Sequence, residues 1–240
     1  MSGKLYGVGI GPGDPDLITL RAKRVLEEVN YICYPRKSEE ESGLARDAVK
    51  KTVDYRGELK GLHFPMTQDK NRLRRSRESA ARQMFNLLQD EKDLAFITIG
   101  NPLWYSTYNY MLNRLKYYDD FELETIPGVN SMDACAARLN LPLASGRDKI
   151  VVFPLTSDPE KIDETLEGYE TVVFLKVSRD YEMLIDRLKK NGRAETSYLL
   201  SHCGREEEFI TNDLDSYRGN EIPYMSIVVS MRKSQLNLFE

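Results

Sequence analysis

Apolar residues along this 240-residue chain fall into two kinds of segment. Short continuous apolar runs are typical of strands buried in a sheet, and longer stretches with apolar residues three or four positions apart are typical of helices. The first half of the chain alternates between the two kinds. Strands are expected at 5–10, 31–34, 59–65, 94–99 and 121–126, and helices at 18–29, 44–53, 69–89 and 106–116. This order predicts a mostly parallel sheet with helices on both faces.

Beyond about residue 128 the pattern changes. Helices are expected only at 132–139 and 180–190, and strands at 149–154, 171–177, 197–203, 207–211 and 225–231. Several strands with few helices favour a mixed sheet. We therefore predict an α/β protein with two domains. The first, 1–128, has a mostly parallel sheet, and the second, 129–240, is an α+β domain with a mixed sheet.

Composition excludes several classes of partner. The chain is 41% hydrophobic and 30% charged, which is typical of a globular protein in water. Its net charge of −4 gives no general attraction to nucleic acid or to an anionic membrane. No apolar run is long enough to span a bilayer, and no leader-peptide pattern precedes the first strand. We expect neither a nucleic-acid nor a membrane partner.

The cysteines and histidines do not form a recognisable site. Cys33, Cys135 and Cys203 are far apart in the sequence, which argues against a disulfide framework. Neither His63 nor His202 lies near a pair of cysteines, so no metal site is expected. Neither histidine can be assigned the role of a base. A reduced, cytoplasmic setting is the expectation.

Three turns rich in glycine and proline each follow a predicted strand. They are Gly9-Ile10-Gly11-Pro12-Gly13-Asp14, Gly100-Asn101-Pro102 and Pro127-Gly128-Val129-Asn130-Ser131. Ligands of α/β proteins bind outside the carboxyl ends of strands, so the turns predict one composite small-molecule pocket. Plain strand-to-helix turns remain the alternative. Likewise, Ser106 or Thr107, after the second turn, can serve as a helix N-cap or as a ligand contact.

The first turn does not fit a dinucleotide. Pro12 removes a backbone N–H where a pyrophosphate would be held, and the motif lacks the spacing of the Gly-x-Gly-x-x-Gly fingerprint. The second strand, 31–34, also lacks the acidic residue expected at its end. We therefore expect a ligand without phosphates.

The order and spacing of these turns resemble the tetrapyrrole methylases, which are class III S-adenosylmethionine (SAM) methyltransferases. The resemblance covers nearly the whole chain. Some segments resemble the branch of the family that methylates C20 of precorrin-2 or cobalt-factor II. These segments are Tyr34-Pro35-Arg36-Lys37-Ser38, Phe64-Pro65-Met66-Thr67-Gln68-Asp69, Pro102-Leu103-Trp104-Tyr105-Ser106-Thr107-Tyr108 and Ile222-Pro223-Tyr224-Met225-Ser226.

The resemblance implies two α/β domains with SAM in the cleft between them, and a homodimer. It also implies a set of residues around the cofactor. In the first domain these are Pro12, Ile99, Gly100, Asn101, Pro102, Trp104, Tyr105, Ser106, Thr107, Asn130 and Ser131, and in the second Lys176, Cys203, Pro223 and Tyr224. Most family members carry Asp where this chain has Asn101. If the family carboxylate attracts the cofactor, Asn101 weakens binding; if the backbone holds the cofactor, little changes.

A basic run lies on the helix predicted at 69–89. Its cations are Lys70, Arg72, Arg74, Arg75, Arg77 and Arg82. A solvated helix face is one interpretation. The other is a rim that binds the carboxylates of a tetrapyrrole, for which Arg72 and Arg75 are the candidates.

The function implied by the resemblance is methylation of C20 of a precorrin-2-type tetrapyrrole, in corrin biosynthesis, with SAM as the methyl donor. Tyr105 or Tyr108 is the candidate helper if a proton must leave the methylated carbon. Two alternatives stay open. One is a sister methylase that acts on another tetrapyrrole carbon, on RNA or on protein, and the other is a non-catalytic module that binds a nucleoside or tetrapyrrole. Whether the ring already carries cobalt is left open.

Overall fold

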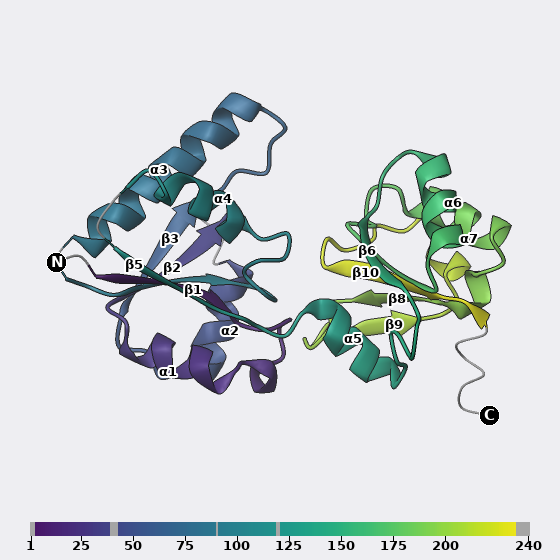
Figure 1. The fold of residues 1–240 in the computed structure, drawn as a ribbon, viewed down its shortest axis with the longest axis horizontal. Coiled ribbons are helices and arrows are strands. Elements are labelled where there is room, and N and C mark those ends of the chain that lie inside the picture. Colours follow the sequence, from purple (N-terminus) through teal and green to yellow (C-terminus); the bar gives the residue numbers. More distant parts are fainter. Residues whose placement is uncertain (1–2, 39–42, 90, 119–120, 234–240) are drawn as a thin grey trace. The chain divides into compact units, whose positions relative to one another are not determined.

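The computed structural model describes residues 3–38, 43–89, 91–118 and 121–233. The chain divides into two compact units, Met1–Ser131 and Met132–Glu240. The boundary thus lies three residues beyond the one that the sequence pattern places between 128 and 129. Each unit contains one five-stranded sheet (Figure 1).

The sheet of the first unit is parallel throughout. Its order is β3-β2-β4-β1-β5, and every neighbouring pair runs in the same direction. The strands are β1 (Lys4–Gly9), β2 (Tyr31–Arg36), β3 (Glu58–His63), β4 (Leu94–Thr98) and β5 (Glu122–Ile126). The expectation of a mostly parallel sheet is therefore confirmed.

Helices cover both faces of this sheet. Helices α1 (Leu20–Glu28) and α2 (Leu44–Thr52) lie on one face, and α3 (Lys70–Leu88) and α4 (Thr107–Leu115) on the other (Figure 1). Neighbouring strand residues point to opposite faces: Phe96 packs with α3 and α4, and Ile97 with α1 and α2. Because helices cover both faces, the central strand β4 is buried along its whole length.

Strands β1 and β4 form the topological switch point of this sheet. They are neighbours, but the chain leaves β1 through α1 towards β2 and leaves β4 through α4 towards β5, on opposite sides. The two connections therefore leave the carboxyl ends of β1 and β4 in opposite directions. In open α/β sheets this is the place where ligands bind.

The sheet of the second unit is mixed, as expected. Its order is β6-β7-β10-β8-β9, and only β6 and β7 pair in parallel. The strands are β6 (Ile150–Pro154), β7 (Thr171–Leu175), β8 (Ser197–Ser201), β9 (Phe209–Thr211) and β10 (Ser226–Met231). The helices are α5 (Ser131–Leu139), α6 (Pro159–Gly168) and α7 (Tyr181–Lys190), of which α6 and α7 share one apolar core with the sheet.

Helix α6 is absent from the pattern described above, although its signals are present in the sequence. Asp158 caps the helix by accepting from the backbone N–H of Glu160, and Pro159 occupies the first turn. Ile162 and Leu166, four residues apart, are buried.

The first expected helix, 18–29, also differs from the structure: a 3₁₀ turn, Pro15–Leu17, precedes α1. In the described part of the chain, no helix has both the length and the apolarity needed to cross a membrane.

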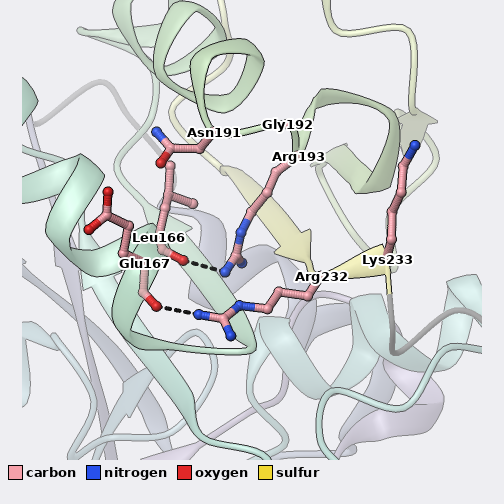
Figure 2. Close-up of a pocket in the computed structure, with 7 residues that line it drawn as sticks. All are labelled: Leu166, Glu167, Asn191, Gly192, Arg193, Arg232 and Lys233. Carbon is pink, nitrogen blue, oxygen red and sulfur yellow. Dashed lines mark hydrogen bonds between the residues drawn. The ribbon is translucent and has the colours of Figure 1, made fainter.

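A buried arginine closes the carboxyl end of α6. Arg193, only 5% exposed, donates to the backbone carbonyls of Leu166, Tyr169 and Glu170. It lies in a pocket of about 440 Å³, where the guanidinium of Arg232 donates to the carbonyl of Glu167 (Figure 2). The arginines thus satisfy the carbonyls that the end of a helix leaves without partners.

We predict that Arg193→Met lowers the stability of this unit by on the order of 3 kcal/mol, because the carbonyls of Leu166 and Tyr169 lose the Arg193 donor and the carbonyl of Glu170 loses one of its two donors. The midpoint of thermal unfolding, followed by circular dichroism, should fall by about 10 °C or more. Lys233→Met is the matched control, since Lys233 lines the same pocket and its ion pair with Glu195 is exposed. Equal shifts in the two variants would contradict the role assigned to Arg193.

Candidate functional site

The turns after β1 and β4 are joined by their backbones. The N–H of Gly100 donates to the carbonyl of Gly11 over 2.7 Å, and the two residues form an isolated antiparallel bridge. Both glycines have a left-handed backbone, with φ of +78° at Gly11 and +70° at Gly100. The contact therefore holds the turns after β1 and β4 together at the switch point of the sheet.

The third turn packs against the same contact. A Cβ atom on Gly9 would lie 2.5 Å from the carbonyl oxygen of Gly100 and 2.6 Å from the nitrogen of Gly128. A Cβ on Gly128 would likewise collide with the carbonyl oxygen of Gly100. Backbones can approach this closely only where no side chain intervenes. The structure thus brings together all three turns that the sequence singles out.

Gly100 differs from these two glycines. A Cβ atom there would meet no atom within 4 Å. Its positive φ accounts for the glycine, and the space beside its Cα is open. A ligand can therefore approach the backbone of Gly100 closely.

Asn101 and Ser106 shape the chain beyond Gly100. The side-chain Oδ1 of Asn101 accepts from the N–H of Leu103 over 3.0 Å, and its carbonyl accepts from the N–H of Trp104 over 3.2 Å. Ser106 caps α4, its Oγ accepting from the N–H of Tyr108 over 3.0 Å. The N-cap interpretation of Ser106 is therefore confirmed. Because the Asn101 oxygen already serves the turn, the geometry favours a ligand contact through the backbone at this position.

In the second unit, the residues expected around the cofactor lie at one edge of the sheet. Leu175, at the end of β7, pairs with Ile227 near the start of β10, and Ser201, at the end of β8, pairs with Ser226. Lys176 and Cys203 therefore follow strands whose carboxyl ends adjoin the amino end of β10, where Pro223 and Tyr224 lead in. The Arg193 pocket lies at the opposite edge, beside the amino ends of β7 and β8.

Cys203 turns its side chain into the unit. Its thiol contacts that of Cys135 on α5, and both cysteines are free and buried. The hydrogen bond from Cys135 lowers the pKa of the Cys203 thiol. Glu208 reinforces this contact, because it pairs with Arg138 over 3.2 Å and accepts from the N–H of Gly204. A ligand at this edge would therefore meet the backbone of Cys203.

Comparison with known proteins identifies the family. The family model for the tetrapyrrole (corrin/porphyrin) methylases matches residues 4–216. The chain belongs to this family. It is 34% identical to the "probable cobalt-precorrin-2 C(20)-methyltransferase" of Methanocaldococcus jannaschii and 29% identical to the cobalt-precorrin-2 C(20)-methyltransferase of Salmonella typhimurium, in each case over 95% of this chain and 96% of the relative.

A solved structure shares the fold of this methylase. The crystal structure of a cobalt precorrin-4 methyltransferase, a cobalamin biosynthetic enzyme, superposes with a TM-score of 0.73 at 19% identity. The superposition covers 95% of this chain and 94% of the other. The family and the two-unit α/β fold that the sequence predicts are confirmed.

The structure places the remaining candidate residues of the methylase at the same edge of the first sheet. Pro12 is buried in the first turn, and Asn130 and Ser131 follow Gly128 and are half-buried. Thr107 begins α4. Ile99 and Pro102 flank the Gly100-Asn101 turn, and Trp104 and Tyr105 are exposed beyond it. Tyr105 has an unusual φ of +48°.

Tyr108 does not fit its predicted catalytic role. Its side chain is fully buried, stacks on Phe96 and bonds the Thr125 hydroxyl over 3.0 Å. Its ring fills the space above Gly7, where a Cβ would collide with it. Burial raises the pKa of Tyr108, so the hydroxyl stays neutral. We assign Tyr108 to the core and withdraw it as a catalytic candidate.

Arg72 and Arg75 are exposed in the first turns of α3. Ser76, on the same helix, donates to the carbonyl of His63 at the carboxyl end of β3. That end lies at the same edge of the sheet as the turns after β1 and β4, because all strands are parallel. Arg77, by contrast, lies 3.6 Å over the ring of Tyr110 and packs within the unit.

In the second unit, His202 lies directly after β8, beside Cys203, and the sequence leaves it without a role. It is half-buried and has a φ of +50°, as Lys176 has a φ of +59°. No sequence signal marks either position, because a left-handed backbone is readable only where glycine or asparagine occupies it. In the described ranges, no group of three or more His, Cys, Asp and Glu side chains could hold a metal ion.

Proposed function

We propose that this protein is a SAM-dependent C-methyltransferase that methylates C20 of precorrin-2 or of its cobalt complex in corrin biosynthesis. The observation that carries the proposal is the full-length similarity to two cobalt-precorrin-2 C(20)-methyltransferases. The segments around Tyr34, Phe64, Trp104 and Tyr224 support the same branch of the family.

The turns after β1 and β4 fit SAM better than a phosphate-bearing cofactor. Pro12 offers no N–H, and the turn at Gly100 offers backbone groups beside open space. In the proposal, the backbone of Ile99, Gly100, Asn101 and Pro102 holds the methionine part. When bound, SAM would supply an electrophilic methyl group on its sulfonium; an electron-rich ring carbon would bond to that methyl group as its bond to sulfur breaks, and S-adenosylhomocysteine would leave as a neutral thioether.

The residues of the chain then act mainly by alignment. The Gly11–Gly100 bond and the Asn101 turn fix the backbone that binds the cofactor, and such positioning accounts for much of the rate of a two-substrate reaction. Trp104, Tyr105 and Thr107 would face the methyl-transfer side and exclude water. Lys176, Cys203, Pro223 and Tyr224 would bind the adenine.

We predict that Gly100→Ala weakens binding of SAM or S-adenosylhomocysteine at least about tenfold, because the new methyl group enters the space through which the ligand meets the backbone. The measurement is isothermal calorimetry. Gly219→Ala is the matched control: Gly219 has a φ of +74°, and a Cβ there also meets nothing within 4 Å. Both variants thus carry a similar backbone strain of about 1–2 kcal/mol. Unchanged affinity in Gly100→Ala would contradict the placement.

Arg72 and Arg75 are proposed to bind carboxylates of the tetrapyrrole, for which the forked guanidinium is suited. We predict that the double variant Arg72→Ala/Arg75→Ala raises the KM for the tetrapyrrole and leaves SAM affinity intact. The effect should shrink as salt rises, because exposed charges are screened over about 10 Å at 0.1 M.

Steady-state kinetics at two salt concentrations measures this effect. Lys50→Ala/Lys51→Ala removes the same charge from α2, on the other face of the sheet, and should leave KM unchanged. If both double variants alter KM equally, only net charge matters and α3 is a solvated surface.

The function itself is tested by a methylation assay on precorrin-2 and cobalt-precorrin-2, each with SAM. Mass spectrometry should show the gain of one methyl group, and NMR with ¹³C-labelled methyl should place it on C20. Methylation at another carbon would identify a sister methylase. Binding of SAM without any turnover on either tetrapyrrole would favour a non-catalytic module.

The homodimer and a cytoplasmic location are part of the proposal. Large side chains are exposed before, on and after α4, among them Leu103, Tyr110 and Tyr117, and a second copy could cover them. Sedimentation velocity should give about twice the chain mass of 27.7 kDa. A single-chain mass at all concentrations would contradict the dimer.

The cytoplasmic location is supported by the cysteines: all three are free thiols, as expected in a reducing compartment.

A further inference from the structure

Two buried serines and the imidazole of His202 are connected by hydrogen bonds at the carboxyl end of β8 in the second sheet. Ser226, the first residue of β10, donates from its Oγ to the Oγ of Ser201 over 3.0 Å. Ser201 Oγ lies 3.2 Å from Nδ1 of His202. Ser226 and Ser201 are 2% and 1% exposed, whereas His202 is partly exposed. The chain of hydroxyls therefore runs from the interior of the sheet to one side chain at its edge.

The direction of the hydrogen bond between Ser226 and Ser201 favours one tautomer of a neutral His202. Within the described residues, the hydrogen bonds of the Ser201 hydroxyl run only to Ser226 and His202. Ser201 accepts from Ser226, so its own hydrogen is directed to Nδ1 of His202. A neutral imidazole that accepts at Nδ1 carries its hydrogen on Nε2. His202 therefore presents an N–H donor away from the serines.

The backbone at His202 is held in a costly conformation. Its φ of +50° lies in the left-handed region, which costs a non-glycine residue roughly 1–2 kcal/mol. Two backbone hydrogen bonds of 3.0 Å hold it there: His202 N–H donates to the carbonyl of Met225, and Arg205 N–H donates to the carbonyl of His202. Lys176, at the same edge, shares this conformation. Such strain tends to persist where a ligand is bound.

The neighbours of His202 are the residues proposed to bind adenine. Cys203 follows His202 directly, and the N–H of His202 donates to the carbonyl of Met225, the residue after Tyr224. Because the Cys203 thiol turns inward to Cys135, the side chain that this loop offers at the edge is the imidazole.

We propose that His202 is a cofactor-binding residue whose Nε2–H donates to an acceptor atom on the nucleoside part of SAM, a ring nitrogen or a ribose oxygen. Ser201 is the positioning residue that fixes the tautomer. This inference rests on the proposed function.

The test measures S-adenosylhomocysteine binding by isothermal calorimetry to the parent and to His202→Gln, His202→Met and Ser201→Ala. Glutamine can place its amide N–H near the position of Nε2, whereas methionine keeps the length and loses the donor. Both carry the same backbone strain. We expect His202→Met to bind about tenfold more weakly, His202→Gln to stay within about threefold of the parent, and Ser201→Ala to lose about twofold to fivefold. His63→Met should bind like the parent, and circular dichroism verifies the fold of each variant.

The results distinguish failure of the proposed function from failure of the role of His202. A parent protein that does not bind S-adenosylhomocysteine contradicts the proposed function itself. A parent that binds, with His202→Met equally tight, overturns the role of His202. Equal weakening in His202→Gln and His202→Met overturns it too, since the loss then reflects structure and not the donor. Parent-like binding by Ser201→Ala overturns the tautomer argument.

Discussion

The candidate site of this methylase depends on one backbone hydrogen bond, from the N–H of Gly100 to the carbonyl of Gly11. The bond crosses the switch point of a parallel sheet, where the connections after β1 and β4 diverge. It requires two left-handed glycines and leaves no room for side chains at Gly9 and Gly128. The same arrangement leaves the space beside Gly100 open. Close packing on one side and an accessible backbone on the other follow from a single contact.

In both units, the candidate ligand-binding residues follow the carboxyl ends of strands, but the strand directions differ. In the first unit, all strands are parallel, so every carboxyl end lies at the same edge. In the second, β10 runs against β7 and β8, and the lead-in to β10 joins the carboxyl ends of its neighbours. The arginine pocket at the opposite edge is already occupied by helix carbonyls and ion pairs. Its chemistry is that of a helix cap, which explains why a large cavity there need not bind a ligand.

Much of this could be predicted from the sequence, because it depends on local patterns. The alternation of strand-like and helical segments predicted the parallel sheet, and the glycine-proline turns predicted which loops meet. The cap formed by Asp158 and Pro159 was readable as well, although α6 was not expected. Other features depend on packing that one segment does not record. Tyr108 belongs to the core because Gly7, a hundred residues earlier, leaves space for its ring. The left-handed backbone of His202 and its serine partners likewise arise from pairing between β8 and β10.

Amide hydrogen exchange followed by mass spectrometry, with and without S-adenosylhomocysteine, tests the central claim most directly. The proposal is that the ligand binds the turns at the carboxyl ends of β1 and β4 in the parallel sheet. In the mixed sheet it binds near Lys176, His202 and Tyr224. Bound ligand should slow exchange in peptides covering 9–13, 99–104 and 127–131, and in those covering 176–177, 202–204 and 223–225. Peptides covering 191–193, in the arginine pocket, should exchange as before. Protection confined to that pocket, or absent from the Gly11 and Gly100 turns, would contradict the account.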